Sequence, residues 1–429
     1  FNGTLSCSHC YFVGFTKEEK IASHKKLLTL LENFLAVCSS NNVAPFLIDH
    51  VILQSIEENS TRQITSKDTC RHLCQKPWIS LAVFENNLYP HGLNNHILNS
   101  LKEGGIKCID FSGKDTRNIK LNGTSTKTVP FHYFFSRDDV TIHVIILYNR
   151  EGLGLWFGAL SRKTVDIYRF TLNENEGLLA RFSLSTAIID GFTMRMPFPV
   201  KEFLKNLDNS RFLPCNHTRA RLFYSKYGDD TSFEARKFRK RGREVLKIAK
   251  LALDRLEIRF WLSSGTCLGW FRQCNVISHG KDMDIGIWIK DYDKRLIDEF
   301  QENGLYLEHL FGRIEDSFQL SFRTMDDIKL DIFFFYEENG YMWNGGTQAR
   351  TAKKFKYIFP NFSLCWTEFL DLKVRVPCET LSYVEANYGK SWPQPIKLWD
   401  WKKSPSNVFE NGKWNEKELH DVIQFFEIE

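Results

Sequence analysis

The sequence predicts an α/β (α+β) protein with two domains. Apolar runs of strand length alternate with longer segments whose apolar residues recur every three or four positions, which is typical of mixed folds. The chain has 429 residues, and about 150 residues per domain is usual, so two or three domains are expected. Hydrophobic residues make up 43% and aromatic residues 14% of the chain, which excludes disordered and low-complexity classes.

The overall charge narrows the class of partner. A net charge of +5 suits small anionic substrates, but spread over this length it does not indicate nucleic acid. No apolar run reaches the ~18 residues needed to cross a bilayer. Because the chain begins at Phe1 rather than Met, we expect that an N-terminal segment has been removed.

The first domain is expected to span residues 1–232. Two segments with apolar stripes predict helices, Lys17–Cys38 and Leu93–Gly104. Five apolar runs predict strands: Ala44–Ile48, Ile79–Phe84, Ile106–Phe111, Val129–Phe135 and Thr141–Tyr148. No catalytic motif accompanies them, so we expect a stem-like α/β domain that positions an acceptor or partner subunits.

The second domain, residues 233–429, is expected to begin with a long helix over Glu234–Leu256. Its first half is strongly basic, with Arg236, Lys237, Arg239, Lys240, Arg241 and Arg243. Such a run is usually a solvated helix face, and the alternative is a wall that attracts anions beside a phosphate site. A short strand, Arg259–Leu262, follows it.

A small-residue turn comes directly after that strand. Ser264, Gly265 and Thr266 lie where a strand runs into a helix, so their backbone N–H groups can point at a phosphate. Arg272, soon afterwards, is a further candidate for phosphate binding. Small residues are common in turns, so this pattern alone is weak.

Two aspartates stand two positions apart in the next predicted strand. In Lys281–Ile289, Asp282 and Asp284 project from the same face, because side chains in a strand alternate. Two like charges held side by side repel each other, and a divalent cation such as Mg²⁺ or Mn²⁺ is the simplest compensation. The alternative is a strand end at which both carboxylates are solvated.

A third aspartate favours the metal interpretation. Asp331 is the one carboxylate in the otherwise mostly apolar strand predicted over Ile328–Phe335, and a lone buried carboxylate is unfavourable unless it is paired or bound to metal. A small-residue turn, then D-x-D, then a lone Asp is the pattern of nucleotidyltransferase-fold enzymes. We therefore expect Asp282, Asp284 and Asp331 to bind metal and to act in phosphoryl transfer, on a domain with a mixed sheet.

A region rich in glycine and lysine follows the third aspartate. We expect a Gly-Gly turn within Trp343–Gln348, after which cations and aromatics hold a base and a diphosphate. The candidate substrate-binding residues are Trp343, Asn344, Lys353, Lys354, Lys356 and Tyr357. The alternative is a surface loop with solvated lysines.

The cysteines and glycosylation sequons give weaker signals. Of the eleven cysteines, Cys7/Cys10 and Cys70/Cys74 are local pairs, which we interpret as structural disulfides or free thiols ahead of zinc ligands. Cys267 is expected to be a packing residue. Five N-x-S/T sequons, at Asn2, Asn59, Asn122, Asn216 and Asn361, weakly favour a secretory route.

The second half of the chain resembles the fukutin family of LicD-type phosphotransferases. The similarity runs from about Glu234 to Lys403, and the first half is similar more loosely, as in Pro45–Asp49 and Ser210–Cys215. The segments that carry it are Phe260–Trp270, Lys281–Ile287, Lys329–Tyr336, Met342–Gln348, Leu364–Phe369, Val376–Thr380 and Glu385–Lys390.

This resemblance implies a specific activity. Members transfer ribitol 5-phosphate from CDP-ribitol to a GalNAc of the phosphorylated O-mannosyl core glycan on α-dystroglycan, releasing CMP. The resemblance also implies a type II membrane protein of the Golgi with its anchor before Phe1, a glycosyltransferase-like first domain, and association with other enzymes of the same glycan pathway. The wider pattern often has an acid at the position of Gly280, so this chain favours one firmly held Mg²⁺ over two.

Two other functions remain open at this point. A D-x-D glycosyltransferase that uses a nucleotide sugar would share the metal, and only the choice of donor would separate it. A non-catalytic scaffold or glycan-binding protein could keep the acidic residues without their role.

Overall fold

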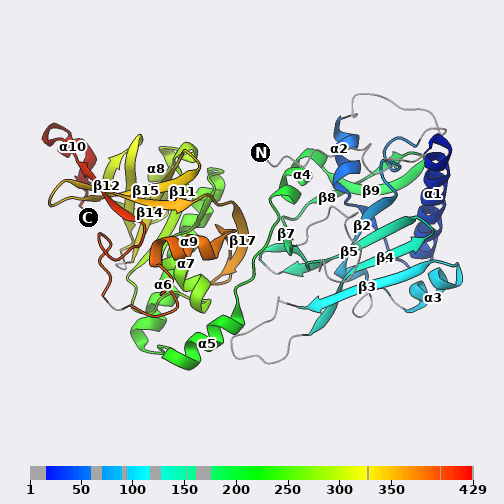
Figure 1. Cartoon of the computed structure of the whole chain (residues 1–429), viewed down its shortest axis with the longest axis horizontal. Helices are drawn as coiled ribbons and strands as arrows, with labels where there is room; N and C mark the ends of the chain where they lie inside the picture. Colours follow the sequence, from blue (N-terminus) through cyan, green and yellow to red (C-terminus); the bar gives the residue numbers. More distant parts are fainter. Residues whose placement is uncertain are drawn as a thin grey trace. The chain divides into compact units, whose positions relative to one another are not determined.

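The protein is described here by a computed structural model (Figure 1). It describes residues 16–58, 70–88, 93, 95–115, 127–150, 152–160, 175–325, 328–396 and 398–427. The chain forms two compact units, Phe1–Phe212 and Leu213–Glu429. Both are mixtures of helices and strands, which confirms the predicted α/β class. The Cys7/Cys10 pair and the sequons at Asn2, Asn59 and Asn122 lie outside the described residues.

The first unit is built on a mixed sheet. Within the described residues its main strand order is β3-β4-β5-β2-β1-β9-β8, and β6 and β7 extend it from β5. The strands are β1 (Phe46–Leu47), β2 (Trp78–Phe84), β3 (Lys107–Lys114), β4 (Thr128–Arg137), β5 (Val140–Arg150), β6 (Gly154–Phe157), β7 (Gly177–Leu179), β8 (Ser183–Ile189) and β9 (Phe192–Phe198). The helices are α1 (Lys17–Ser40), α2 (His50–Glu58), α3 (Asn95–Glu103) and α4 (Val200–Asp208).

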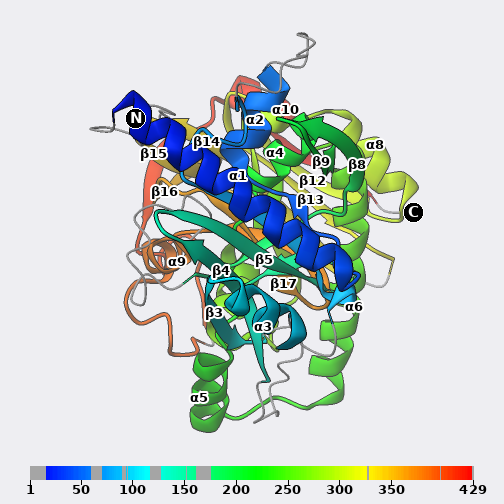
Figure 2. The same ribbon diagram turned by 90° about the vertical axis from the view of Figure 1, so that its right-hand side faces the viewer.

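Helix α1 shows how the sequence determines this layer. Thr16 and Glu19 form a capping box that satisfies the first free N–H groups of the helix. The apolar stripe then buries Leu27, Leu31 and Phe34 against the sheet, where α1 contacts β5. Figure 2 shows α1 running across strands β4 and β5. The predicted helix is therefore confirmed.

The second unit has a larger set of elements around a second mixed sheet. Its helices are α5 (His217–Tyr227), α6 (Phe233–Arg255), α7 (Ser264–Gln273), α8 (Arg295–Glu302), α9 (Thr380–Tyr388) and α10 (Leu419–Val422). Its strands are β10 (Phe260–Leu262), β11 (Asp282–Trp288), β12 (Tyr306–Arg313), β13 (Asp316–Arg323), β14 (Lys329–Glu338), β15 (Tyr341–Gln348), β16 (Lys353–Pro360), β17 (Leu364–Phe369), β18 (Leu372–Pro377), β19 (Val408–Lys413) and β20 (Ile423–Phe425).

The boundary between the units falls earlier than expected. We expected it after residue 232, but the units divide between Phe212 and Leu213. The Leu213 backbone N–H donates to the Trp366 carbonyl at 2.8 Å, and Cys215 forms a disulfide with Cys274 at the end of α7. Helix α5 also packs on α7. The segment before the basic helix is therefore attached to the second unit by covalent and hydrogen bonds.

The register of β11 and β14 determines where the aspartates lie. These strands pair in parallel, with Asp284 opposite Asp331 and Asp282 opposite Lys329. Opposite residues of a parallel pair face the same side of the sheet, so these four side chains share one face. On its other edge, β11 pairs with β10, which places the buried Trp261 opposite Gly286.

The glycine pair after the third aspartate is not a turn, which corrects our expectation. Gly345 and Gly346 lie inside β15, paired with Lys356 and Phe355 of β16. A side chain at residue 345 would place its Cβ 2.2 Å from the Ser317 Oγ, and at residue 346 it would lie 3.2 Å from the Trp401 ring. The glycines thus permit close packing across the strand rather than a reversal of the chain.

Three disulfides are present in the described part of the chain: Cys70–Cys74, Cys215–Cys274 and Cys365–Cys378. Of the two states left open for the local pair Cys70/Cys74, the structure has the disulfide, while Cys267 is a buried free thiol, as expected of a packing residue. In the described residues, we find no helix that has both the length and the hydropathy for a membrane span.

We expect Gly286→Ala to destabilise the second unit by about 1–3 kcal/mol, as overpacked cores do. The new Cβ would lie 2.4 Å from the Trp261 ring, which is fully buried and cannot move aside without disturbing its neighbours. Urea unfolding followed by intrinsic fluorescence measures this effect as a lower midpoint. An unchanged midpoint would show that the packing between β10 and β11 is looser than described.

Candidate active site

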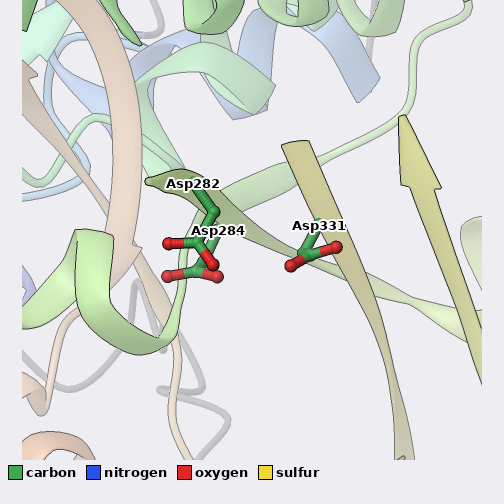
Figure 3. Close-up of side chains that lie close together, drawn as sticks. All are labelled: Asp282, Asp284 and Asp331. Carbon is green, nitrogen blue, oxygen red and sulfur yellow. The ribbon is translucent and has the colours of Figure 1, made fainter. Parts of the chain in front are cut away.

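Three carboxylates converge at the edge of β11 and β14. Asp282 and Asp284 point the same way from β11, and Asp331 faces them from the neighbouring strand (Figure 3). Each contributes an oxygen atom, and these oxygens lie within 4.8 Å of one another. Asp284 and Asp331 are buried, whereas Asp282 is at the exposed rim. We call these three residues the acidic cluster.

The start of α7 holds Asp284 in place. The Thr266 backbone N–H donates to the Asp284 carboxylate at 3.2 Å, and the Asp284 N–H donates to the Thr266 hydroxyl at 2.7 Å. The Ser263 N–H also donates to the Asp284 carbonyl at 3.1 Å. Asp284 therefore accepts the hydrogen bond that the side chain of an N-cap residue would otherwise accept. The N-terminus of α7 also favours its negative charge.

Asp331 is held by its own neighbours. The Ser321 hydroxyl on β13 donates to one carboxylate oxygen, and the Lys329 ammonium lies 2.9 Å from one oxygen and 3.0 Å from the other. Lys329 is the cation that faces the acidic cluster from the same strand. One ammonium group cannot neutralise three carboxylates, so the cluster keeps an excess of negative charge.

The pKa values reflect this excess. Burial raises the pKa of Asp284 well above its usual range, and the charges of Asp282 and Asp331 raise it further. The pKa of Asp282 is also raised, first by removal of water and then by Asp331. Both carboxyls gain affinity for anything positive, whether a proton or a cation. Carboxylate oxygens are the ligands that Mg²⁺ and Mn²⁺ prefer, so the chemistry of the three residues fits the expected metal.

Two cavities meet at the acidic cluster. The helix-side cavity is lined by Phe238 of α6, by Thr266, Leu268 and Arg272 of α7, and by Trp392 and Ile396. The strand-side cavity is lined by Gln319, Lys329, Asp331, Asn344, Tyr357 and Trp401. Five residues line both cavities: Gly265, Asp282, Asp284, Tyr388 and Trp399. Two ligands could therefore approach the acidic cluster from different sides.

The structure brings the three residues of the small-residue turn to the two cavities. Ser264, Gly265 and Thr266 form the first turn of α7, and Ser264 and Gly265 line the strand-side cavity. A Cβ at residue 265 would lie 3.2 Å from an Asp284 carboxylate oxygen, so the glycine keeps that approach open. Backbone and side chains of this turn thus border both the acidic cluster and the cavities.

Arg272 borders the helix-side cavity but is already engaged. It donates to the Gln273 side chain at 2.8 Å and lies over the Phe223 ring. Burial lowers the pKa of the guanidinium to about 10, which leaves it charged at neutral pH. It therefore remains available as a positive charge at the wall of this cavity.

Two of the predicted substrate residues downstream line a cavity at the acidic cluster, and the others do not. Asn344 and Tyr357 pair across β15 and β16 and line the strand-side cavity. Trp343 and the three lysines are not among the lining residues of either cavity. Lys353, Lys354 and Lys356 instead form ion pairs with Glu410, Asp316 and Glu338. The structure does not bring these lysines to the acidic cluster.

Several residues of the site were missed from the sequence. Lys329 had a signal, since it stands two positions before Asp331 on the same strand face. Trp392, Trp399 and Trp401 stand close together in a Pro-containing segment and line the two cavities. Ser321 had no signal, because only the pairing of β13 with β14 brings it to Asp331.

Comparison with known proteins agrees with this description. A family profile described as "Fukutin N-terminal" matches residues 5–243, and one described as "LicD/FKTN/FKRP, nucleotidyltransferase domain" matches residues 257–379. The human protein "Ribitol-5-phosphate transferase FKTN" is 42% identical over 92% of this chain and 88% of its own length. The mouse protein of the same name is 43% identical over the same shares of both chains. "Uncharacterized protein W02B3.4" of Caenorhabditis elegans is 28% identical over 54% of this chain and 61% of its own.

The fold and the site together define the class of the second unit. A small-residue helix start, a D-x-D strand and a third aspartate on the neighbouring strand make the second unit a nucleotidyltransferase-type domain, as the sequence predicted. The chain belongs to the fukutin family, because it matches both family profiles and because its relatives match it along nearly the whole length.

We expect Asp284→Asn to stabilise the metal-free protein by about 1 kcal/mol or more, which raises the melting temperature by ~2–4 °C. Asparagine keeps an acceptor for the Thr266 N–H and removes one of three repelling charges. The gain is largest at neutral pH. Folding raises the pKa of Asp284, so the ionised carboxylate lowers the free energy of unfolding of the wild type at neutral pH. This loss of stability disappears as the pH falls through the raised pKa and the carboxyl becomes neutral.

Differential scanning fluorimetry between pH 5 and 8, in chelator, measures this difference. Asp298→Asn, at an exposed position on α8, provides the control and should shift the melting temperature little. A lower melting temperature for Asp284→Asn at pH 7.5 would mean that the hydrogen bonds of the carboxylate outweigh the repulsion.

Proposed function

We propose that this chain transfers ribitol 5-phosphate from CDP-ribitol to GalNAc of the phosphorylated O-mannosyl core glycan of α-dystroglycan, releasing CMP. Support comes from the curated relatives, which are named ribitol-5-phosphate transferases and match nearly the whole chain. The single structural observation that carries the proposal is the acidic cluster, with three carboxylate oxygens within 4.8 Å between two cavities.

The proposed reaction is one displacement at phosphorus. The oxygen of an acceptor hydroxyl forms a bond to the phosphorus that carries ribitol. The bond from that phosphorus to the bridging oxygen of the diphosphate breaks, and CMP leaves with the bridging oxygen and its electron pair. The hydroxyl proton passes to a carboxylate of the acidic cluster and then to solvent, so one proton is released for each transfer.

Asp282, Asp284 and Asp331 are the residues that would hold Mg²⁺, with Mn²⁺ as a substitute. When bound, such a cation neutralises phosphate charge and stabilises the leaving phosphate. The chain supplies the remaining parts. The first turn of α7 can donate backbone N–H groups to the donor phosphates, Arg272 contributes positive charge at the helix-side cavity, and Trp399 and Tyr388 line both cavities beside the acidic cluster.

We further propose that the protein works in the Golgi lumen, with other enzymes of the same glycan pathway. The three disulfides support an oxidising compartment, because such bonds are rare in the cytosol. The described sequons, at Asn216 and Asn361, are exposed, which is compatible with a lumenal environment.

We expect Asp284→Asn to reduce ribitol-phosphate transfer at least ~10³-fold, because loss of a preorganised charge at a phosphoryl-transfer site removes several kcal/mol of transition-state stabilisation. Transfer to a GalNAc-terminated phosphoglycopeptide, followed by mass spectrometry, measures it. Asp298→Asn should retain full turnover. Wild-type turnover in Asp284→Asn would show that the acidic cluster is not the active site.

We expect wild-type protein to bind CDP in calorimetry only when Mg²⁺ or Mn²⁺ is present, and to lose transfer activity in EDTA. The diphosphate and the acidic cluster repel each other without a cation between them. A donor panel of CDP-ribitol, CDP-glycerol and UDP-sugars separates this function from a nucleotide-sugar glycosyltransferase. Failure to bind CDP with either metal would instead favour a non-catalytic scaffold.

A further inference from the structure

One buried amide in the strand-side cavity lacks a partner. Asn344, in the middle of β15, is 4% exposed, and its side-chain oxygen Oδ1 is fully buried without a hydrogen bond in the described part of the structure. Buried side-chain oxygens are nearly always paired in folded proteins. A rotation of the side-chain amide exchanges the positions of its oxygen and nitrogen, so an unpaired amide on a residue that lines a cavity points to a ligand that donates to Oδ1 after that rotation. The residue lines the strand-side cavity beside the acidic cluster.

We propose that the strand-side cavity is the subsite for the acceptor sugar, and that the Asn344 amide turns so that Oδ1 faces the cavity and accepts a hydrogen bond from an N–H or O–H of that sugar. This inference rests on the proposed function, because it assigns one of the two substrates to one of the two cavities. It adds a binding residue and a location for the acceptor.

The chemistry of the cavity suits a sugar. Its polar members are mostly neutral amides and hydroxyls, among them Gln319, Thr347 and Asn387, which match the edge of a pyranose. Its rim carries the Trp401 ring, which is 39% exposed and can lie against the C–H face of a sugar. Pockets that combine aromatic walls with a few directed polar groups are typical small-ligand sites.

The aromatic wall is held in place before any ligand arrives. The Tyr357 hydroxyl donates to the Trp401 carbonyl at 2.8 Å, and Phe355 packs edge-on against the Trp401 ring with 5.3 Å between ring centres. Gly346 leaves the space that this ring occupies, since a Cβ there would lie 3.2 Å from it. A preorganised wall lowers the entropy that binding would otherwise lose.

The position of Asp331 favours the acceptor over the donor for this cavity. Asp331 and Lys329 line the strand-side cavity only, whereas Asp282 and Asp284 line both cavities. In an in-line displacement the attacking and leaving oxygens stand on opposite sides of the phosphorus, so the two substrates must reach the acidic cluster from different directions. The helix-side cavity offers the positive charge of Arg272 and apolar walls such as Phe238 and Leu268, which suit a nucleotide diphosphate.

Ligand-observed NMR tests this without relying on turnover. The probes are methyl N-acetyl-α-galactosaminide and methyl α-galactoside, each titrated into the full chain with Mg²⁺ and CDP. We expect saturation transfer to the first probe, with affinity about tenfold weaker in Asn344→Leu and in Trp401→Ala. Leucine matches the size of asparagine, and Trp401 is exposed enough that its removal spares the core.

Asn407→Leu is the matched control. Asn407 is also buried with an unpartnered Oδ1, but it is not among the residues that line the strand-side cavity. The Asn407→Leu variant should bind the sugar probe with wild-type affinity. Selective loss of the acetamido probe in Asn344→Leu would support an N–H donor, and equal loss of both probes would support a hydroxyl donor. Wild-type affinity in both Asn344→Leu and Trp401→Ala would overturn the subsite.

The two proposals fail differently. If the variants lose the sugar probe while wild-type protein transfers nothing from CDP-ribitol, the subsite is supported and the proposed reaction is wrong. If the wild type transfers ribitol phosphate and the variants bind the probe normally, with an unchanged acceptor KM, the reaction stands and the subsite is overturned.

Discussion

The parallel pairing of β11 with β14 is the constraint on which the rest of the second unit depends. It places Asp284 directly opposite Asp331 and keeps Asp282 on the same face. Three carboxylates at this distance repel each other, and the surrounding structure offsets only part of that repulsion through Lys329, Ser321 and the start of α7. The remaining negative charge supports the proposed function, because it would favour a cation at the acidic cluster and, through that cation, a diphosphate.

Strand periodicity explains how much of this could be predicted. Asp282 and Asp284 are two positions apart, so their common face follows from local geometry alone, and the single carboxylate among the apolar residues at the start of β14 identifies Asp331. The lysines downstream show the limit. Their clustering in sequence suggested a phosphate site, but partners on other strands, such as Asp316 and Glu338, pair with them away from the cavities. Cross-strand register is a tertiary property that one segment does not reveal.

Tertiary contacts that one segment does not reveal also explain why the glycine pair and the boundary between the units differ from our predictions. A Gly-Gly sequence is common in turns, yet at residues 345 and 346 it serves strand packing against Ser317 and Trp401, which the local sequence cannot indicate. We expected the boundary after residue 232, whereas the disulfide between Cys215 and Cys274 attaches the segment that begins at Leu213 to the second unit. Distant partners decide both features.

That disulfide also connects the stability of the unit with its chemistry. Cys274 is the C-cap of α7 and adopts a left-handed conformation with φ of 53°, while the N-terminus of the same helix donates to Asp284. Gly269 brings the helix within contact of the Asn275 carbonyl, where any Cβ would lie 2.5 Å away. One short helix is thus fixed at its C-terminal end by a covalent bond and at its N-terminal end by hydrogen bonds with Asp284. Displacement at either end would be transmitted along ten residues of rigid backbone, so the position of the acidic cluster depends on contacts well outside it.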